Sequence, residues 1–234
     1  MPTTPQNKTI LLIGASRGLG CAMAAEYLKH GWSVVATARG SVRTPLHDLA
    51  DKSEDRIEIE TVDICEPDEV AALRARLSGR VFDALFVNAG VTNDPTETIA
   101  DVTTEEFVRV MVTNALSPMR VIEALQDLVS ATGTIGAMSS GQGSVSNNTT
   151  GMREVYRGSK AALNMFMRSF AARHAAGSRA MVLMAPGWVR TDLGGPDGRL
   201  SIEESIPSLV KVLLSVEGVP GLRYLDYLGR TVPW

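Results

Sequence analysis

Short apolar runs alternate with helix-forming segments along almost the whole chain, and this alternation limits the possible folds more than any other feature. Most of the runs are continuously apolar, which is typical of strands buried on both faces of a parallel sheet. Strands are expected at Lys8–Gly14, Trp32–Ala38, Arg56–Val62, Val81–Val87, Thr134–Met138, Arg179–Ala185 and Gly221–Leu228. Helices are expected at Leu19–His30, Thr44–Lys52, Pro67–Leu77, from Thr103 toward Val129, and at Glu154–Ala176 and Ile202–Ser215. The order predicts an α/β fold, a doubly wound parallel sheet of about seven strands with helices on both faces.

Local signals refine the ends of these helices. Gly31 is expected to end the first helix as a C′ glycine. Thr103 and Glu106 are expected to form a capping box at the start of the long helix, which Pro118 is expected to bend.

Composition adds bounds on size, partners and location. A chain of 234 residues with 44% hydrophobic content predicts a single domain over residues 1–234, preceded by a polar tail at residues 1–7. The formal net charge of −3 is spread without basic or acidic blocks, so neither a nucleic-acid nor a membrane partner is expected. The two cysteines lack metal-ligand spacing, and no metal site is expected. Without a signal peptide pattern, the expected location is the cytoplasm.

The segment EVYRGSKAALNM contains a tyrosine and a lysine four residues apart. On a helix, Tyr156 and Lys160 project from one face, one turn apart. An ammonium close to a phenol favours the phenolate, so the pair is expected to lower the pKa of Tyr156 and to exchange protons. The alternative interpretation is a surface tyrosine stacked on a lysine stem.

A glycine-rich turn, Gly14-Ala-Ser-Arg-Gly-Leu-Gly20, joins the first expected strand to the first expected helix. Its glycines allow close approach of a ligand to the backbone, and the helix start offers free N–H groups to a pyrophosphate. The predicted cofactor-binding residues of this turn are Gly14, Ser16, Arg17, Gly18, Leu19 and Gly20. The alternative is a tight strand-to-helix turn with no ligand.

Charges near this turn favour one dinucleotide. The second strand ends at Arg39 with no acid in reach, where enzymes that select NAD usually carry a carboxylate for the ribose, and Arg17 lies in the turn itself. Two cations without a carboxylate favour NADP over NAD. The alternative is that Arg39 is simply a solvated arginine.

Two further strand ends carry residues suited to a nucleotide. Asp63 and Ile64 follow the third strand, near an adenine edge, and Asn88-Ala89-Gly90 follow the fourth, where backbone can approach a ribose. Asp63 is equally suited to cap the helix that begins near Pro67, and Asn88 to stabilise its turn.

Taken together, these motifs resemble the short-chain dehydrogenase/reductase family, whose fold is Rossmann-type. The resemblance covers the glycine turn, Asn88–Gly90, Asn114, the Ser139-Ser140 pair, Tyr156-Arg-Gly-Ser-Lys160, and Pro186-Gly187 through Thr191. The sequences YRGSKAALNM, PGWVRTDLGG and LDYLGRTVPW are similar to the C-factor and sniffer-like carbonyl reductase branch.

The resemblance implies a catalytic set of Asn114, Ser140, Tyr156 and Lys160. It makes Tyr156 the general acid, Lys160 a group that lowers its pKa and binds the nicotinamide ribose, Ser140 the donor to the substrate oxygen, and Asn114 a residue that kinks its helix. Ser140 lies 16 positions before Tyr156, a few more than is common in the family, so Ser139 and Ser144 remain alternatives.

The resemblance also implies further cofactor contacts from Pro186, Gly187, Val189 and Thr191, in addition to Tyr156 and Lys160. The glycine-rich residues 193–200 are expected to form a short, flexible lid over a small carbonyl substrate. A homodimer or homotetramer is expected, because family members commonly associate.

The leading functional hypothesis is NADPH-dependent reduction of a ketone or aldehyde to an alcohol by hydride transfer. The alternative is a signalling or regulatory factor of the same fold that binds dinucleotide with little or no turnover. The presence of all four catalytic positions favours the enzyme.

Overall fold

A seven-stranded parallel sheet forms the centre of the computed structural model, which describes residues 8–234; the expected tail at residues 1–7 lies outside the described residues. The strands are β1 (Thr9–Ile13), β2 (Ser33–Ala38), β3 (Ile57–Thr61), β4 (Phe82–Val87), β5 (Val129–Met138), β6 (Ala180–Ala185) and β7 (Gly221–Asp226). Their order is β3-β2-β1-β4-β5-β6-β7, and all neighbours pair in parallel. The predicted doubly wound sheet is confirmed.

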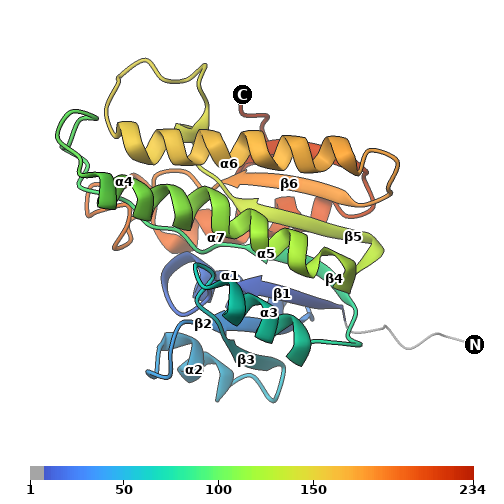
Figure 1. Cartoon of the computed structure of the whole chain (residues 1–234). Coiled ribbons are helices and arrows are strands. Elements are labelled where there is room, and N and C mark those ends of the chain that lie inside the picture. Colours follow the sequence, from blue (N-terminus) through green and yellow to red (C-terminus); the bar gives the residue numbers. More distant parts are fainter. Residues whose placement is uncertain (1–7) are drawn as a thin grey trace, which may run out of the picture.

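Helices cover both faces of this sheet (Figure 1). They are α1 (Gly18–Lys29), α2 (Pro45–Ala50), α3 (Pro67–Arg76), α4 (Thr104–Met111), α5 (Ser117–Leu125), α6 (Glu154–Arg173) and α7 (Ile202–Ser215). One hydrophobic core lies between the sheet and α3, α5 and α6, and contains Leu73, Ile122 and Leu163. A second core lies between the other face and α1, α2 and α7, and contains Met23 and Leu209. Because a core covers each face of the sheet, the strands need apolar side chains on both faces, and this agrees with their continuous apolar runs.

Of the two expected helix-end signals, Gly31 agrees with the structure and the capping box agrees only in part. Gly31 follows the cap residue His30 with φ of +80°, as expected of a C′ glycine. The Thr103 side chain accepts a 3.2 Å hydrogen bond from the Glu106 N–H, but the Glu106 carboxylate pairs with Arg109 at 2.6 Å instead of closing the capping box. The predicted box is thus half formed.

The long helix expected from Thr103 toward Val129 is wrong in two places. A π-helical turn, Val112–Leu116, separates α4 from α5 and precedes Pro118, so the irregularity is not at the proline. After α5, a 3₁₀ turn (Gln126–Leu128) leads directly into β5 at Val129, five residues before the expected start at Thr134. The register between β4 and β5 is irregular in this added part. Residues 130–132 are half-buried or exposed, so no apolar run marks the start of the strand.

The strand order places a crevice at the carboxyl ends of β1 and β4. From β1 the chain runs outward to β2 and β3, then returns to pair β4 with the other side of β1. The connections after β1 and β4 therefore diverge to opposite faces of the sheet. Ligands of doubly wound sheets bind at such a position.

Candidate active site

The glycine turn after β1 is packed against the end of β4. Gly14 has φ of +84°, and a Cβ at this position would lie 2.7 Å from the Ala89 nitrogen. The Asn88 side-chain amide donates a 2.7 Å hydrogen bond to the Gly14 carbonyl, and a Cβ on Gly20 would lie 2.2 Å from that same oxygen. Only glycine fits at positions 14 and 20. The structure thus brings together two sequence motifs that lie 74 residues apart, and Asn88 does stabilise the turn.

The same turn presents the start of α1 to the crevice. This 12-residue helix begins at Gly18, and within residues 8–234 no side chain caps it, since Arg17 at the N-cap makes no capping bond. The first helical turn, Gly18-Leu19-Gly20, has no acidic residue. A Cβ on Gly18 would meet nothing within 4 Å, so the turn is open on the ligand side. Unpaired N–H groups at a helix start fit the pyrophosphate of a dinucleotide.

Two exposed arginines flank this cradle, and each contacts a carboxylate. Arg17 lies 3.4 Å from Asp192, and Arg39 lies 3.7 Å from Asp63. The expectation that no acid is in reach of Arg39 is wrong: β2 and β3 pair in parallel, so their carboxyl ends bring Arg39 and Asp63 side by side. Both arginines are largely exposed to solvent, so these ion pairs hold them only weakly.

Asp63 and Ile64 follow β3, and the alternative that Asp63 caps the next helix is wrong. The Asp63 carboxylate accepts a 2.9 Å hydrogen bond from the Cys65 N–H, whereas the cap residue of α3 is Glu66. The Ile64 side chain is buried in the core. Any contact of Ile64 with a nucleotide is therefore limited to its backbone, and Asp63 does not cap α3.

Tyr156 and Lys160 lie on the buried face of α6, as their spacing predicts. Their exposed fractions are 6% and 3%, so the alternative of a surface pair is wrong. The Lys160 Nζ lies 5.9 Å from the centroid of the Tyr156 ring and donates a 2.9 Å hydrogen bond to the carbonyl of Met138, at the end of β5. A Cβ on Gly90 would lie 3.4 Å from this Nζ, which places the lysine beside the loop after β4.

Burial dominates the protonation of both groups. Burial raises the pKa of Tyr156, while a hydrogen-bonding contact with the Ser140 hydroxyl and the charge of Arg153 lower it. Burial also lowers the pKa of Lys160 to about 8. The expectation of a lowered pKa for Tyr156 is therefore wrong for the protein alone, because loss of water outweighs the polar contacts of the phenol.

Asn114 connects the loop after β4 to α6. It lies in the π-helical turn and is fully buried. Its side-chain oxygen accepts a 2.8 Å hydrogen bond from the Val91 N–H, and its amide donates to the Val91 carbonyl at 2.8 Å and to the Ser159 Oγ at 3.0 Å. The π geometry is typical of functional sites, and here it coincides with an asparagine that bridges two elements.

The three serines after β5 differ in their surroundings. Ser139 is buried and donates its hydroxyl to the Asn164 side chain at 2.6 Å. The Ser144 hydroxyl accepts a 3.2 Å hydrogen bond from the Asn147 N–H. The Ser140 hydroxyl accepts from the Gln142 N–H at 3.1 Å and contacts the phenol of Tyr156. Of the three, Ser140 is the one whose hydroxyl reaches the tyrosine.

The segment after β6 folds back on itself. Pro186 accepts a 2.7 Å hydrogen bond from Ser205, and Gly187 has φ of +85°. Val189 is buried and bridges to Leu200, while the Thr191 hydroxyl accepts from the Gly194 N–H at 3.0 Å.

Hydrogen bonds also fix the expected lid at residues 193–200. The Trp188 indole donates to the Gly194 carbonyl at 2.7 Å, and Arg190 donates to the Gly198 carbonyl at 2.9 Å. These two hydrogen bonds connect the segment to the residues that follow β6, and its expected flexibility stays a prediction. Its role as a lid stays a prediction.

Several polar residues at this site carry no motif. Ser159 and Asn164 belong to the buried face of α6, and their spacing from Tyr156 identifies them in retrospect. Thr37 accepts a 2.9 Å hydrogen bond from the Gly14 N–H, and Tyr224 on β7 donates its hydroxyl to the carbonyl of Ser140. For the last two, only the pairing of the strands provides the signal.

Residues 8–234 contain neither a cluster suited to a metal ion nor a helix suited to cross a membrane. Within that range, no three His, Cys, Asp or Glu side chains cluster closely enough to hold a metal ion. Nor does that range contain a helix that is long and apolar enough to cross a membrane.

A doubly wound sheet with an anion-accepting glycine turn and a buried tyrosine–lysine pair defines a Rossmann-type dinucleotide-binding protein. The family profile described as short chain dehydrogenase matches residues 8–199. The chain belongs to the short-chain dehydrogenase family.

Similar proteins support both the family and its branch. A solved short-chain dehydrogenase/reductase from Burkholderia multivorans with bound NADP is 66% identical, with a TM-score of 0.97 over 98% of this chain and 100% of that one. The C-signal of Myxococcus xanthus is 36% identical over 154 residues, which are 65% of this chain and 92% of that protein. The carbonyl reductase Sniffer of D. melanogaster is 27% identical, with a TM-score of 0.86 over 98% of this chain and 100% of that one. The expected C-factor and sniffer-like branch is confirmed.

Proposed function

We propose that the protein reduces a ketone or an aldehyde to an alcohol with NADPH, and that Tyr156 is the general acid. The observation that carries this proposal is the position of the buried phenol and ammonium of α6, at the same sheet edge as the glycine turn. The membership of the family and the NADP bound to the Burkholderia protein support the choice of cofactor. Bound NADPH supplies the hydride for the carbonyl carbon.

The side chains of the site have distinct roles in this proposal. Tyr156 gives its proton to the carbonyl oxygen, and the Ser140 hydroxyl donates a hydrogen bond to the same oxygen as negative charge develops. Lys160 places an ammonium near the phenol and the nicotinamide ribose. Asn114 holds the loop after β4 against α6. Because burial raises the pKa of Tyr156, the phenol is protonated at neutral pH, which is the form that reduction requires.

A direct assay tests this function. The purified chain is mixed with NADPH or NADH and a panel of aromatic and aliphatic ketones and aldehydes, and oxidation of the cofactor is followed by absorbance. We expect turnover of small carbonyl compounds with NADPH. Failure to oxidise either cofactor with every compound contradicts the proposal.

A regulatory role with little turnover is the second candidate function, and the similarity to the C-signal favours it. Binding of NADPH combined with the absence of turnover in the same assay would support this candidate.

The preference for NADPH is proposed to depend on Arg39. We expect Arg39→Asp to weaken NADPH binding by about 2–3 kcal/mol, or roughly 30- to 150-fold, because a charge-assisted contact to the 2′-phosphate is replaced by repulsion. Binding of NADH should change by less than about threefold. Dissociation constants from cofactor fluorescence check this, with Lys52→Asp as a control that changes an exposed cation by the same charge. An unchanged ratio of the two constants would mean that other residues select the cofactor.

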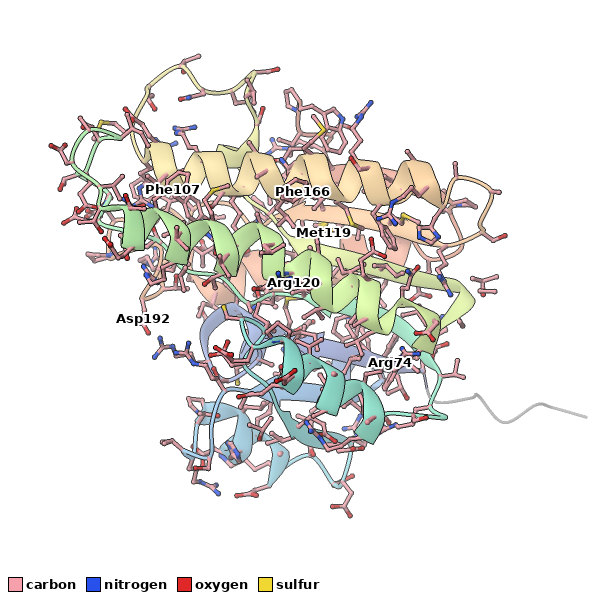
Figure 2. The ribbon with its side chains drawn as sticks, viewed as in Figure 1. Arg74, Phe107, Met119, Arg120, Phe166 and Asp192 are labelled. Carbon is pink, nitrogen blue, oxygen red and sulfur yellow. The ribbon has the colours of Figure 1, made fainter. Side chains whose placement is uncertain are left out.

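We also propose that the chain forms a homodimer or homotetramer through the outer surface of α4 and α6. Phe107 on α4 and Phe166 on α6 lie on the helical layer that faces the viewer in Figure 2, and their exposed fractions are 38% and 44%. Met165 on α6 is 61% exposed, and the two helices are in contact. Exposed apolar side chains on one layer are typical of an interface, and a second copy supplies a matching apolar surface.

The double change Phe107→Glu and Phe166→Glu is expected to convert the oligomer to a monomer, because it would bury four carboxylates in each two-fold interface. Light scattering coupled to gel filtration measures the mass. Val42→Glu introduces the same charge at an exposed apolar residue before α2 and should leave the mass unchanged. An oligomer that persists in the double variant contradicts this choice of surface.

A further inference from the structure

A buried polar cluster of Ser139, Asn164 and Tyr224 lies next to the turn that carries Ser140. The exposed fractions of the three side chains are 2%, 4% and 1%. Burial raises the pKa of Tyr224, and the polar side chains of Asn164 and Ser139 near its hydroxyl lower it in part. None of the three has a part in the proposed chemistry. Burying three polar side chains in contact costs free energy unless their hydrogen bonds are well formed. We therefore expect the cluster to have a structural or functional role.

Tyr224 holds one end of the Ser140 turn. Its hydroxyl donates to the carbonyl of Ser140, which also accepts a 2.8 Å hydrogen bond from the Gly143 N–H. Tyr224 is on β7, at the far side of β6 from β5. The carbonyl orientation of Ser140 is thus fixed from a strand two positions away in the sheet.

Asn164 holds the other end of the same turn. Its side-chain amide donates a 3.1 Å hydrogen bond to the carbonyl of Gly143, while its oxygen accepts from Ser139 at 2.6 Å. A Cβ on Gly143 would lie 3.0 Å from the Asn164 nitrogen and 2.9 Å from the Lys160 Cβ, so the turn lies directly on α6. Because Asn164 comes two helical turns after Tyr156, one helix face carries both the phenol and the support of the turn.

We propose that Tyr224 and Asn164 are positioning residues, which together fix the Ser140 hydroxyl against the phenol of Tyr156. This inference rests on the proposed function for its kinetic consequence. If the contact of Tyr224 or that of Asn164 is removed, Ser140 remains in the turn, but its hydroxyl is no longer oriented toward the reacting oxygen. The effect of both residues is therefore transmitted entirely through Ser140.

A double-mutant cycle tests whether Tyr224 affects the reaction only through Ser140. Tyr224→Phe is expected to lower kcat for carbonyl reduction about 10- to 100-fold, with the Kd of NADPH unchanged within about twofold. In a Ser140→Ala background, Tyr224→Phe should change kcat by less than about twofold, because the group it positions is gone. Tyr27→Phe, which removes the hydroxyl of a buried tyrosine on α1, is the control and should have no effect. Equal losses of kcat in the two backgrounds overturn the proposal.

A second measurement is independent of turnover. Tyrosine labelled at Cζ allows the pKa of Tyr156 to be measured by NMR in the protein without cofactor. The groups that face this phenol are Ser140, Arg153, Tyr224 and Lys160. Asn164→Ala removes none of these four side chains, but it is expected to displace the Ser140 hydroxyl. A rise in the pKa of Tyr156, in the same direction as in Ser140→Ala, would report this displacement. An unchanged pKa in Asn164→Ala, with the rise present in Ser140→Ala, contradicts the proposal.

The two arms separate this inference from the proposed function. If the wild type reduces no carbonyl compound, the function fails while the NMR measurement still decides whether Asn164 positions Ser140. If the wild type is active and the cycle is additive, the function stands and the positioning role fails.

Discussion

Tyr156→Phe is expected to lower kcat for carbonyl reduction by about 10²- to 10⁴-fold or more, while NADPH binding is retained. The substitution removes the proton that the proposed reaction delivers to the carbonyl oxygen. It keeps the aromatic ring that packs under Lys160, so the shape of the cofactor crevice is preserved. A loss in kcat without a change in the Kd of NADPH is the signature of a group that acts in the transition state.

The measurement combines steady-state kinetics with cofactor fluorescence. Thermal unfolding of the variant should match that of the wild type, which separates loss of chemistry from loss of structure. Turnover within about tenfold of the wild type would remove Tyr156 from the role of general acid.

Lys160→Met is expected to abolish turnover and to stabilise the fold. Burial lowers the pKa of Lys160 from 10.5 to about 8, so the unfolded chain binds more protons than the folded chain between these two pH values. The free energy of unfolding of the wild type should therefore rise as the pH increases from about 8 to about 10.5. At pH 7 the cost of burying the ammonium is fully present. A displacement of about 2.5 pH units at about 1.4 kcal/mol per unit gives a cost of about 3–4 kcal/mol.

Methionine removes this cost but leaves the Met138 carbonyl without its donor, a loss of about 1 kcal/mol. We expect a net gain of about 2 kcal/mol in the free energy of unfolding at pH 7, together with loss of its rise between pH 8 and 10.5. Urea unfolding at several pH values measures both. Lys211→Met, at an exposed position of α7, is the control and should change neither. A variant that is no more stable than the wild type, with the same pH dependence, would contradict the buried ammonium.

The sequence predicted the sheet well because its signals are local. Runs such as Lys8–Gly14 are apolar on both faces, and only a strand covered by two helical layers satisfies them. The helix that includes Asn114 was predicted only in part. Its π-helical turn contains Asn114, whose side chain is hydrogen-bonded to Val91, 23 residues earlier, and no local pattern in the sequence indicates this contact.

The site shows the same division. The spacing of Tyr156 and Lys160 predicted that they share a helix face, but not the direction of the pKa of Tyr156, which follows from burial by distant segments. Likewise, the neighbours of Arg39 in sequence contain no acid, while the pairing of β2 and β3 provides Asp63. Contacts between residues on neighbouring strands could not be predicted from local sequence patterns.

The hydrogen bond from Tyr224 to Ser140 has a consequence for how the protein is made. During synthesis the glycine turn and its partner Asn88 leave the ribosome within the first 90 residues, whereas Tyr224 follows more than 80 residues after Ser140. A nascent chain therefore has the residues of its glycine turn long before it has the tyrosine that holds the Ser140 turn. The Ser140 turn therefore gains its contact with β7 only after Tyr156 and Lys160 on α6 have been synthesised.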